Sequence, residues 1–163
     1  MTERHLVRID SPIGRIEIIA DGSAITALSI EHDGTLLHDG EPEHSDAVLE
    51  RAKTQLAEYF DGVRTEFDLP VHLEGTEFQR AVWERLRRLR HGDATSYGAL
   101  AAAVGKPGSA RAIGGAVGAN PVPIIIGCHR VLASDGRITG YSGGEGVPTK
   151  LWLLGHEKIG FAA

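Results

Sequence analysis

The chain has 163 residues, 42% hydrophobic and 24% charged, which is typical of a globular protein with room for one or two domains. No apolar run approaches the roughly 18 residues that a membrane-spanning helix needs, and the first ten residues lack the apolar core of a signal peptide. We therefore expect a cytoplasmic protein with no membrane contact. The single cysteine excludes an internal disulfide and a zinc site built on several thiolates.

The net charge of −5 hides a strong asymmetry along the chain. Residues 1–74 carry 6 basic and 16 acidic side chains, whereas residues 75–163 carry 11 basic and 6 acidic ones. A polyanion such as DNA would therefore meet the second half of the chain, with the acidic half facing away from it. An acidic segment that only aids solubility would give the same totals.

The first segment has the alternation of β-strands. Three such stretches are separated by turn signals: residues 6–9, 15–20 and 25–30. The polar residues 31–44 indicate a loop. We predict that this segment forms an antiparallel sheet.

A helix should follow that loop. Ser45 or Asp46 can cap a helix over residues 47–60, whose apolar residues recur at helical spacing. Residues 66–73 are expected to add a further strand. The fold class predicted for the chain is thus α/β (α+β), with a small sheet-and-helix domain over residues 1–74 and a mostly helical domain over residues 75–163.

The second half opens with helical periodicity. A helix is predicted over residues 76–90, with an apolar face that includes Trp83 and Leu86 and an opposite face carrying five arginines. Those arginines either contact a polyanion or simply face solvent.

Two short helices about a Gly/Pro turn form a helix-turn-helix pattern. They are predicted over residues 97–104, after a cap at Thr95 or Ser96, and over residues 110–117. The second is unusually rich in alanine and glycine, although each glycine costs a helix up to about 1 kcal/mol. Small residues allow close approach to another backbone, either a neighbouring helix or a DNA groove.

The cysteine follows a stiff, apolar stretch. The prolines of N-P-V-P restrict the backbone, and residues 124–126 are apolar and expected to be buried. Cys128 is followed by His129. If the chain is extended here, neighbouring side chains point to opposite faces, so the imidazole would reach the sulfur through a water or a local distortion. A thiolate is the nucleophile, and a basic neighbour raises its population.

The last segment supplies further polar groups. A glycine-rich loop over residues 140–144 contains Tyr141 and Ser142, and a final helix is predicted over residues 150–158. Glu157 lies near its end. A carboxylate beside a histidine would fix the tautomer of that histidine and raise its basicity.

Residues 75–158 closely resemble the O6-alkylguanine-DNA alkyltransferases. The strings that carry the resemblance keep that family's order and nearly its spacing: T-E-F-Q-R-A-V-W, T-S-Y-G-A-L-A, A-R-A-I-G-G-A-V-G-A-N-P-V-P-I-I-I-G-C-H-R-V, G-Y-S-G-G and L-W-L-L-G-H-E. The first 74 residues resemble only loosely the family's variable N-terminal domain. The resemblance implies a DNA repair protein that rotates O6-alkylguanine out of duplex DNA and takes the alkyl group irreversibly onto its own cysteine, once per molecule.

The resemblance also implies a role for each catalytic residue. Cys128 would accept the alkyl group. His129 would be its base through a bridging water, and Glu157 would orient His129. Tyr97 would help to protonate the guanine ring as it leaves.

A further set of residues would bind the substrate and the DNA. Ser142 would bond near O6, the backbone carbonyls of Cys128 and Val131 would accept from the exocyclic amine, and Arg111 would fill the stack that the base leaves. Asn120 would brace the turn that joins the helix over residues 110–117 to the active-site strand. The same set is completed by Ser96, Tyr141, Ala110 and Ala112.

One departure from the family is clear: Gly127 stands where the family usually has proline, which puts the rate and the range of alkyl groups in question. No metal or cofactor is implied. The expected partner is double-stranded DNA carrying O6-alkylguanine, with O4-alkylthymine as a further candidate lesion. The protein is expected to be a monomer, with clustering on DNA left open.

Three other functions compete with alkyl transfer. A non-enzymatic lesion binder would share the fold but not need the cysteine. A cysteine hydrolase would use a Cys-His-Glu set with many turnovers. A transcriptional regulator would use the helix-turn-helix but would leave the Cys-His pair and the glycine-rich loop without a role.

Overall fold

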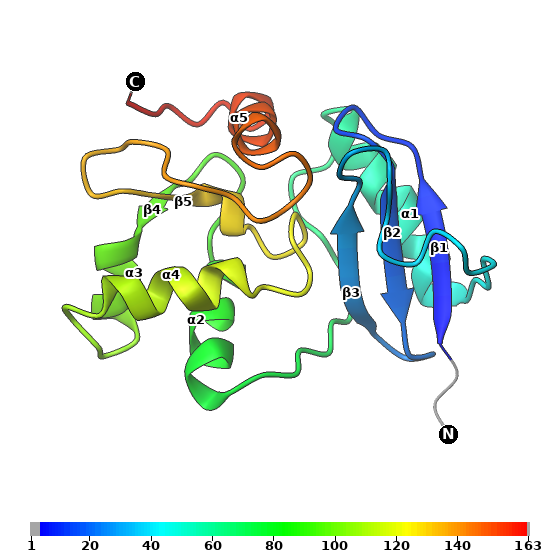
Figure 1. Ribbon diagram of the computed structural model, residues 1–163, viewed down its shortest axis with the longest axis horizontal. Coiled ribbons are helices and arrows are strands. Elements are labelled where there is room, and N and C mark those ends of the chain that lie inside the picture. Colours follow the sequence, from blue (N-terminus) through cyan, green and yellow to red (C-terminus); the bar gives the residue numbers. More distant parts are fainter. Residues whose placement is uncertain (1–3, 163) are drawn as a thin grey trace.

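The computed structural model describes residues 4–162 (Figure 1). Its first part is a three-stranded antiparallel sheet in the order β1-β2-β3, with helix α1 against one face. The bounds are β1 His5–Ile9, β2 Ile16–Ala20, β3 Ile25–Ile30 and α1 Ala47–Phe60. The expected sheet, its three strands and the helix are therefore all present, within one residue at each strand end.

Burial explains why these segments form the sheet and its covering helix. All five residues of the central strand β2 are buried. The inner face of α1 presents Leu49, Ala52, Leu56 and Tyr59, each fully buried and three or four residues apart. Asp46 caps the helix, because its carboxylate accepts from the backbone N–H of Leu49 at 2.8 Å.

The strand predicted over residues 66–73 is wrong. Within the described chain these residues make one isolated bridge, Ile25 to Val71, supported by Ile25 N–H to Pro70 O and His72 N–H to Ile25 O, both 2.9 Å. Pro70 has no N–H, so a continuous ladder cannot extend along this edge.

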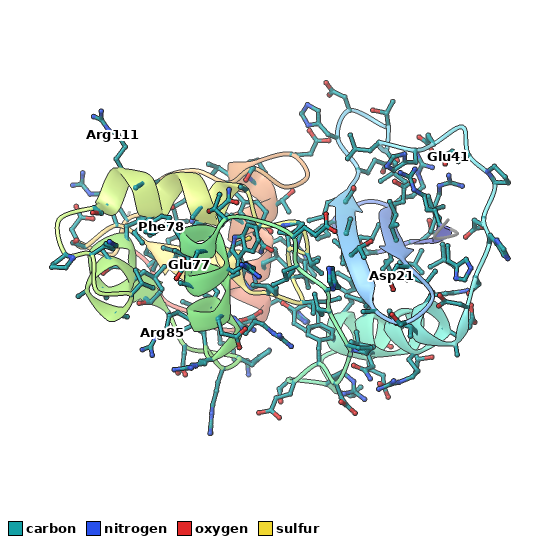
Figure 2. The ribbon with its side chains drawn as sticks, turned by 90° about the horizontal axis from the view of Figure 1, so that it is seen from below. Asp21, Glu41, Glu77, Phe78, Arg85 and Arg111 are labelled. Carbon is teal, nitrogen blue, oxygen red and sulfur yellow. The ribbon has the colours of Figure 1, made fainter. Side chains whose placement is uncertain are left out.

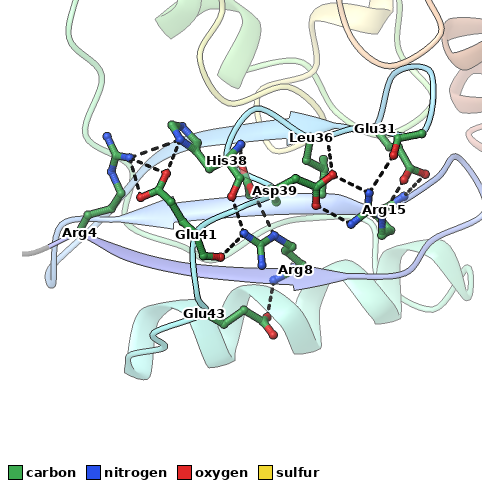
Figure 3. Close-up of polar contacts among 11 residues, drawn as sticks. Arg4, Arg8, Arg15, Glu31, Leu36, His38, Asp39, Glu41 and Glu43 are labelled. Atoms are coloured by element: carbon green, nitrogen blue, oxygen red, sulfur yellow. Dashed lines mark hydrogen bonds and ion pairs between the residues drawn. The ribbon is translucent and has the colours of Figure 1, made fainter.

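The polar loop 31–44 is held against the sheet by arginines from the strands and turns (Figure 3). The Arg15 guanidinium donates to Glu31 at 2.6 Å and to Asp39 at 2.8 and 2.9 Å. Arg8 donates to the carbonyls of His38 and Glu41, both at 2.6 Å. Part of the acidic excess of the first half is therefore neutralised internally, and the loop has a fixed position.

The second part of the chain is mostly helical. Its elements are α2 Glu77–Arg87, β4 Thr95–Ser96, α3 Tyr97–Ala103, α4 Ala110–Gly118, a 3₁₀ helix Cys128–Arg130, β5 Val131–Leu132 and α5 Val147–His156. The helix-turn-helix prediction is confirmed at the level of local structure: α3 and α4 pack on each other and α4 packs on α2 (Figure 1).

Two helices, α2 and α5, have boundaries that differ from the predicted ones by more than one residue. Helix α2 begins with a capping box between Thr76 and Gln79 and ends at Arg87, because the next residues tighten into i→i+3 bonds. Helix α5 begins at Val147 instead of residue 150, with a proline tolerated in its first turn. It ends at His156, so Glu157 is the residue that caps it.

The short strands β4 and β5 were not predicted. They pair in parallel, with Thr95 opposite Val131 and Ser96 opposite Leu132. The pairing brings the start of α3 beside the segment that carries the cysteine, although the paired residues are 36 positions apart in the sequence.

The two parts of the chain share one continuous buried core, which includes β-sheet, α1, α2, α4 and cysteine-segment residues. The domain boundary near residue 74 remains a prediction. The first three residues of the predicted N-terminal domain lie outside the described part of the chain. None of the helices in residues 4–162 has the length and apolar character needed to cross a membrane.

Candidate active site around Cys128

The backbone around the cysteine is tightly turned. Residues 128–130 form a 3₁₀ turn. The extended backbone conformation expected for Cys128 and His129 is therefore wrong. The Cys128 N–H donates to Ile126 O at 2.8 Å. Ile124, a β-branched residue, has φ +74°, a left-handed conformation that costs about 1–3 kcal/mol. Ile124 and Ile126 are buried as expected, and Ile125 is half-buried.

Asn120 braces this turn with both ends of its side chain. Its amide nitrogen donates to Ile126 O at 2.9 Å, and its carbonyl oxygen accepts from Val122 N–H at 3.0 Å. The sulfur of Cys128 therefore projects from backbone whose position is fixed from the end of α4.

The thiol of Cys128 is 6% exposed. Burial raises its pKa, while the side chains of Asn120 and Tyr141 and the positive charge of Lys150 lower it again in part. The Tyr141 hydroxyl is buried without a hydrogen-bond partner among the described residues. Burial and a thiolate at Cys128 both raise the pKa of Tyr141, so its hydroxyl stays neutral and keeps its proton close to the cysteine.

The carboxylate of Glu157 links His129 by hydrogen bonds to two other side chains, Arg130 and Tyr59. Its Oε2 atom lies 2.7 Å from His129 Nε2, and both side chains are completely buried. The Arg130 guanidinium donates to the two carboxylate oxygens at 2.7 and 3.1 Å and to the carbonyl of Leu89 at 2.9 Å. Tyr59, from α1, donates its hydroxyl to Oε2 at 2.6 Å.

The bond to Glu157 defines the tautomer of His129. Because an ionised carboxylate only accepts, Nε2 must carry the proton, which leaves Nδ1 with its lone pair. That Nδ1 atom is buried and has no hydrogen-bond partner within residues 4–162. Burial lowers the pKa of His129, and the nearby Glu157 opposes that shift. The imidazole is therefore a neutral base with its basic nitrogen open.

Lys150 is a buried cation close to the cysteine segment. Its Nζ donates to Val131 O at 2.7 Å and to Gly140 O at 3.2 Å, and the residue is 1% exposed. Burial lowers its pKa, and a thiolate at Cys128 would raise it. It ties the glycine-rich loop to β5.

Two pockets meet at the sulfur. The smaller, of about 220 Å³, is lined by residues of α3, α4 and the glycine-rich loop, including Tyr97, Gly114 and Ser142. The larger, of about 620 Å³, runs towards the N-terminal sheet and its loop, where Leu28, Ile30, Leu36 and Leu37 line it. Cys128 lines both, so a flat ring in one pocket can present a substituent to the other across the sulfur.

Two of the remaining predicted residues, Tyr97 and Ser142, line the smaller pocket, and Ser96 and Val131 lie in the paired strands β4 and β5. The Tyr97 hydroxyl is 3.1 Å from Thr139 Oγ1, and Ser142 donates to Gly118 O at 3.0 Å. Ser96 caps α3 by accepting from Ala99 N–H at 3.0 Å. The Val131 carbonyl already accepts from Lys150, which leaves it a second lone pair.

Helix α4 presents a smooth, exposed face. Ala110, Arg111, Ala112 and Gly115 are exposed, and a Cβ on Gly115 would have no neighbour within 4 Å. Figure 2 shows Arg111 projecting away from the body of the protein. Packing inside the described chain therefore does not explain the small residue at position 115. Arg85 of α2 lies elsewhere, since it points to the opposite side in the same view.

Sequence reasoning missed three members of this site: Tyr59, Arg130 and Lys150. Arg130 sits next to the Cys-His pair, which was a local signal. Lys150 and Tyr59 were read only as parts of amphipathic helices, and no local pattern distinguishes them.

The comparisons with known proteins agree with this geometry. Residues 77–159 match the DNA binding domain of 6-O-methylguanine DNA methyltransferase, and residues 5–73 match the ribonuclease-like domain of the same family. The chain belongs to the 6-O-methylguanine DNA methyltransferase family. The resemblance seen in the sequence is thus confirmed over both halves.

Curated relatives and solved structures support the same membership. Methylated-DNA–protein-cysteine methyltransferases from Haemophilus influenzae and Mycobacterium bovis are 37% and 41% identical to the chain, covering 98% and 94% of it and 89% and 92% of the relatives. The crystal structure of Mycobacterium tuberculosis O6-methylguanine methyltransferase matches with a TM-score of 0.85 at 40% identity, over 96% of this chain and 93% of that one. The Mycobacterium tuberculosis protein in complex with DNA matches with a TM-score of 0.83 at 42% identity, over 94% and 92% of the two chains. The expected fold and enzyme class are confirmed.

Proposed function

We propose that the protein repairs O6-alkylguanine in duplex DNA by moving the alkyl group onto the sulfur of Cys128. The observation that carries this function is the position of that sulfur: it lies at the junction of two pockets, beside a histidine whose Nδ1 is open and whose Nε2 is held by Glu157. The Mycobacterium tuberculosis relative solved in complex with DNA supports DNA as the partner.

The nucleophile is formed by proton transfer. The thiol proton of Cys128 passes through a bridging water to Nδ1 of His129, and Glu157 stabilises the resulting imidazolium. Burial raises the pKa of the free thiol, so little thiolate exists before the substrate arrives. The Tyr141 hydroxyl and the charge of Lys150 then stabilise the anion as it forms.

The alkyl group moves to the sulfur in one displacement step. A lone pair of the Cys128 sulfur forms a bond to the α-carbon of the alkyl group, and the bond from that carbon to O6 breaks. The electron pair goes to the guanine ring, which takes a proton from the Tyr97 hydroxyl, and the proton that His129 had accepted returns through water to the Tyr97 oxygen. Ser142 turns its hydroxyl away from the carbonyl of Gly118 to donate near O6. The products are a thioether on Cys128 and unmodified guanine.

The base must leave the DNA helix to reach the sulfur, because Cys128 is 6% exposed and lines a pocket. The small residues on the exposed face of α4 would allow close approach to a narrow groove, and the exposed Arg111 would fill the gap in the stack. Ala110 and Ala112 flank it against the backbone. The carbonyls of Cys128 and Val131 accept from the exocyclic amine of the rotated base.

Among residues 4–162, no group near Cys128 is suited to remove the alkyl group from the sulfur. A thioether is stable to water and to His129, so one molecule repairs one lesion. The guanine ring would occupy the smaller pocket and the alkyl group would extend into the larger one. No step requires a metal or a cofactor.

The experiment is to incubate the protein with duplex DNA carrying O6-methylguanine and to weigh both. We expect a mass gain of about 14 Da on the protein, one methyl per molecule, and loss of the reactive thiol. Cys128→Ser should gain nothing and still bind the DNA. A protein that keeps its thiol while the base loses its substituent would instead be a hydrolase.

A further inference from the structure

The carboxylate of Glu157 receives hydrogen bonds from both halves of the chain. The Tyr59 hydroxyl, from the last turn of α1, donates to Oε2 at 2.6 Å across 98 positions in the sequence. The same oxygen lies 2.7 Å from Nε2 of His129. A side chain of the N-terminal sheet-and-helix unit thus shares an acceptor atom with the histidine next to the cysteine.

The carboxylate is saturated. Arg130 donates through Nε to Oε1 at 2.7 Å and through Nη2 to Oε2 at 3.1 Å. With Tyr59 and His129 this makes four donors, against about four lone-pair positions on a carboxylate. Three of the four converge on Oε2, so Tyr59 and His129 compete for the charge of one atom.

The Tyr59 ring is fixed in place. It is fully buried, lies edge-on to Phe60 and His156 with centroids 5.3 and 5.0 Å away, and is tilted against Phe67 at 5.4 Å. Its backbone carbonyl lies 2.6 Å from Nε2 of His156, in α5. The hydroxyl is therefore aimed at Glu157 by packing on several sides.

We infer that Tyr59 is a positioning residue for the alkyl transfer proposed above, acting through Glu157. Its hydroxyl holds the carboxylate in place and takes part of its charge. That weakens the pull of Glu157 on the His129 proton and keeps Nδ1 of His129 unprotonated and ready to accept the thiol proton. The N-terminal unit thereby completes the active site.

The charged groups that act on His129 stay unchanged when Tyr59 loses its hydroxyl: Glu157, Arg130 and Lys150. In Tyr59→Phe, the charge that the hydroxyl had taken becomes available to the imidazole. A less shared carboxylate favours the imidazolium, so the pKa of His129 moves up. A protonated His129 cannot accept the thiol proton, and transfer should therefore slow on the acid side.

Two measurements test this. The first is the NMR titration of the His129 imidazole in the free protein, and the second is the pH profile of single-turnover alkyl transfer from lesion DNA. For Tyr59→Phe we expect the His129 midpoint to rise and the transfer rate near pH 6 to fall about tenfold, with recovery towards the normal rate as the pH rises.

The matched control is Trp152→Phe. Trp152 belongs to the same aromatic cluster and stacks on His156 at 4.7 Å, without a hydrogen bond to Glu157. It should leave the His129 midpoint and the pH profile unchanged, even where it lowers stability. Equal shifts in Tyr59→Phe and Trp152→Phe would reduce Tyr59 to a packing residue and overturn the inference.

A second variant keeps the test decisive if Tyr59→Phe folds poorly. Site-specific 3-fluorotyrosine at position 59 retains the ring and makes the hydroxyl a stronger donor, so the His129 midpoint should move down. An unchanged midpoint would contradict the inference. The titration needs no DNA, so it measures the link from Tyr59 to His129 independently of alkyl transfer. A wild-type protein that transfers no alkyl group would refute the proposed function but not this link.

Discussion

The guanidinium of Arg130 lies across Gly127, the residue that stands where the family usually has proline. A Cβ on Gly127 would be 3.0 Å from Cδ, Nε and Cζ of Arg130, the atoms at and next to its bonds with Glu157. Gly127 has φ −74°, a value that alanine and proline both adopt without strain. Space, and not backbone conformation, therefore makes glycine suitable here.

Gly127→Ala should lower the free energy of unfolding by about 1 kcal/mol, because Arg130 is held by Glu157 and by Leu89 O and has to shift. Chemical denaturation measures the change. Gly155→Ala is the control: Gly155 is exposed in α5 with no neighbour within 4 Å of a Cβ, and alanine there should raise stability by about 0.5–1 kcal/mol. A gain at both positions would mean that Arg130 moves freely.

Glu157→Gln should destabilise the protein at pH 7 by about 3 kcal/mol, because Arg130 loses its buried counter-charge. Burial alone would raise the pKa of Glu157, but hydrogen bonds from His129 and Arg130 outweigh it and hold that pKa below its ordinary value of 4.5. A carboxylate with a lowered folded pKa contributes its full stability above the unfolded pKa and loses it as the pH falls through the folded one.

The stability difference between wild type and Glu157→Gln should therefore be constant from pH 7 down to about 5 and shrink below the ordinary value of 4.5. Denaturation curves at several pH values measure it. A difference that persists unchanged at pH 3 would show that the charge of Glu157 contributes nothing to folding.

Local signals predicted much of the fold. Helix α1 was predicted residue for residue because its cap, Asp46, and the spacing of Leu49, Leu56 and Tyr59 are all local. The strand over residues 66–73 failed because alternation outweighed the missing N–H of Pro70. The pairing of β4 with β5 carries no local pattern at all, since it joins two residues to two others far along the chain.

Some residues of the site could also be predicted from the sequence, and others could not. Cys128, His129 and Glu157 were named through a family resemblance, and the geometry brings His129 and Glu157 within 2.7 Å. The contribution of Tyr59 depends on a contact between α1 and the end of α5, which periodicity reports only as a buried helix face. Hydrogen bonds between distant buried groups have no spacing rule, so they need a structure.

The larger pocket predicts a dependence on the size of the alkyl group. Leu37 lines it and is 81% exposed, so Leu37→Trp should narrow its mouth without disturbing the fold. Transfer of a methyl group should be unchanged, while transfer of a benzyl group should slow about tenfold. Val63→Trp, which is exposed and does not line the pocket, is the control. If Leu37→Trp changed the methyl and benzyl transfer rates by the same factor relative to wild type, the alkyl group would lie elsewhere.

Arg111→Ala should slow repair of duplex DNA while leaving transfer from the free base O6-benzylguanine unchanged. Within residues 4–162 the Arg111 side chain makes no hydrogen bond or ion pair, so its loss should not alter the fold. A rotated base leaves a gap whose opening costs a few kcal/mol, and losing the group that fills it should reduce the duplex rate at least tenfold. Arg85→Ala removes the same charge from the opposite side of the protein (Figure 2) and should leave the duplex rate nearly unchanged. Equal losses in the two variants would indicate that charge alone, and not the filling of the stack, accounts for the contribution of Arg111.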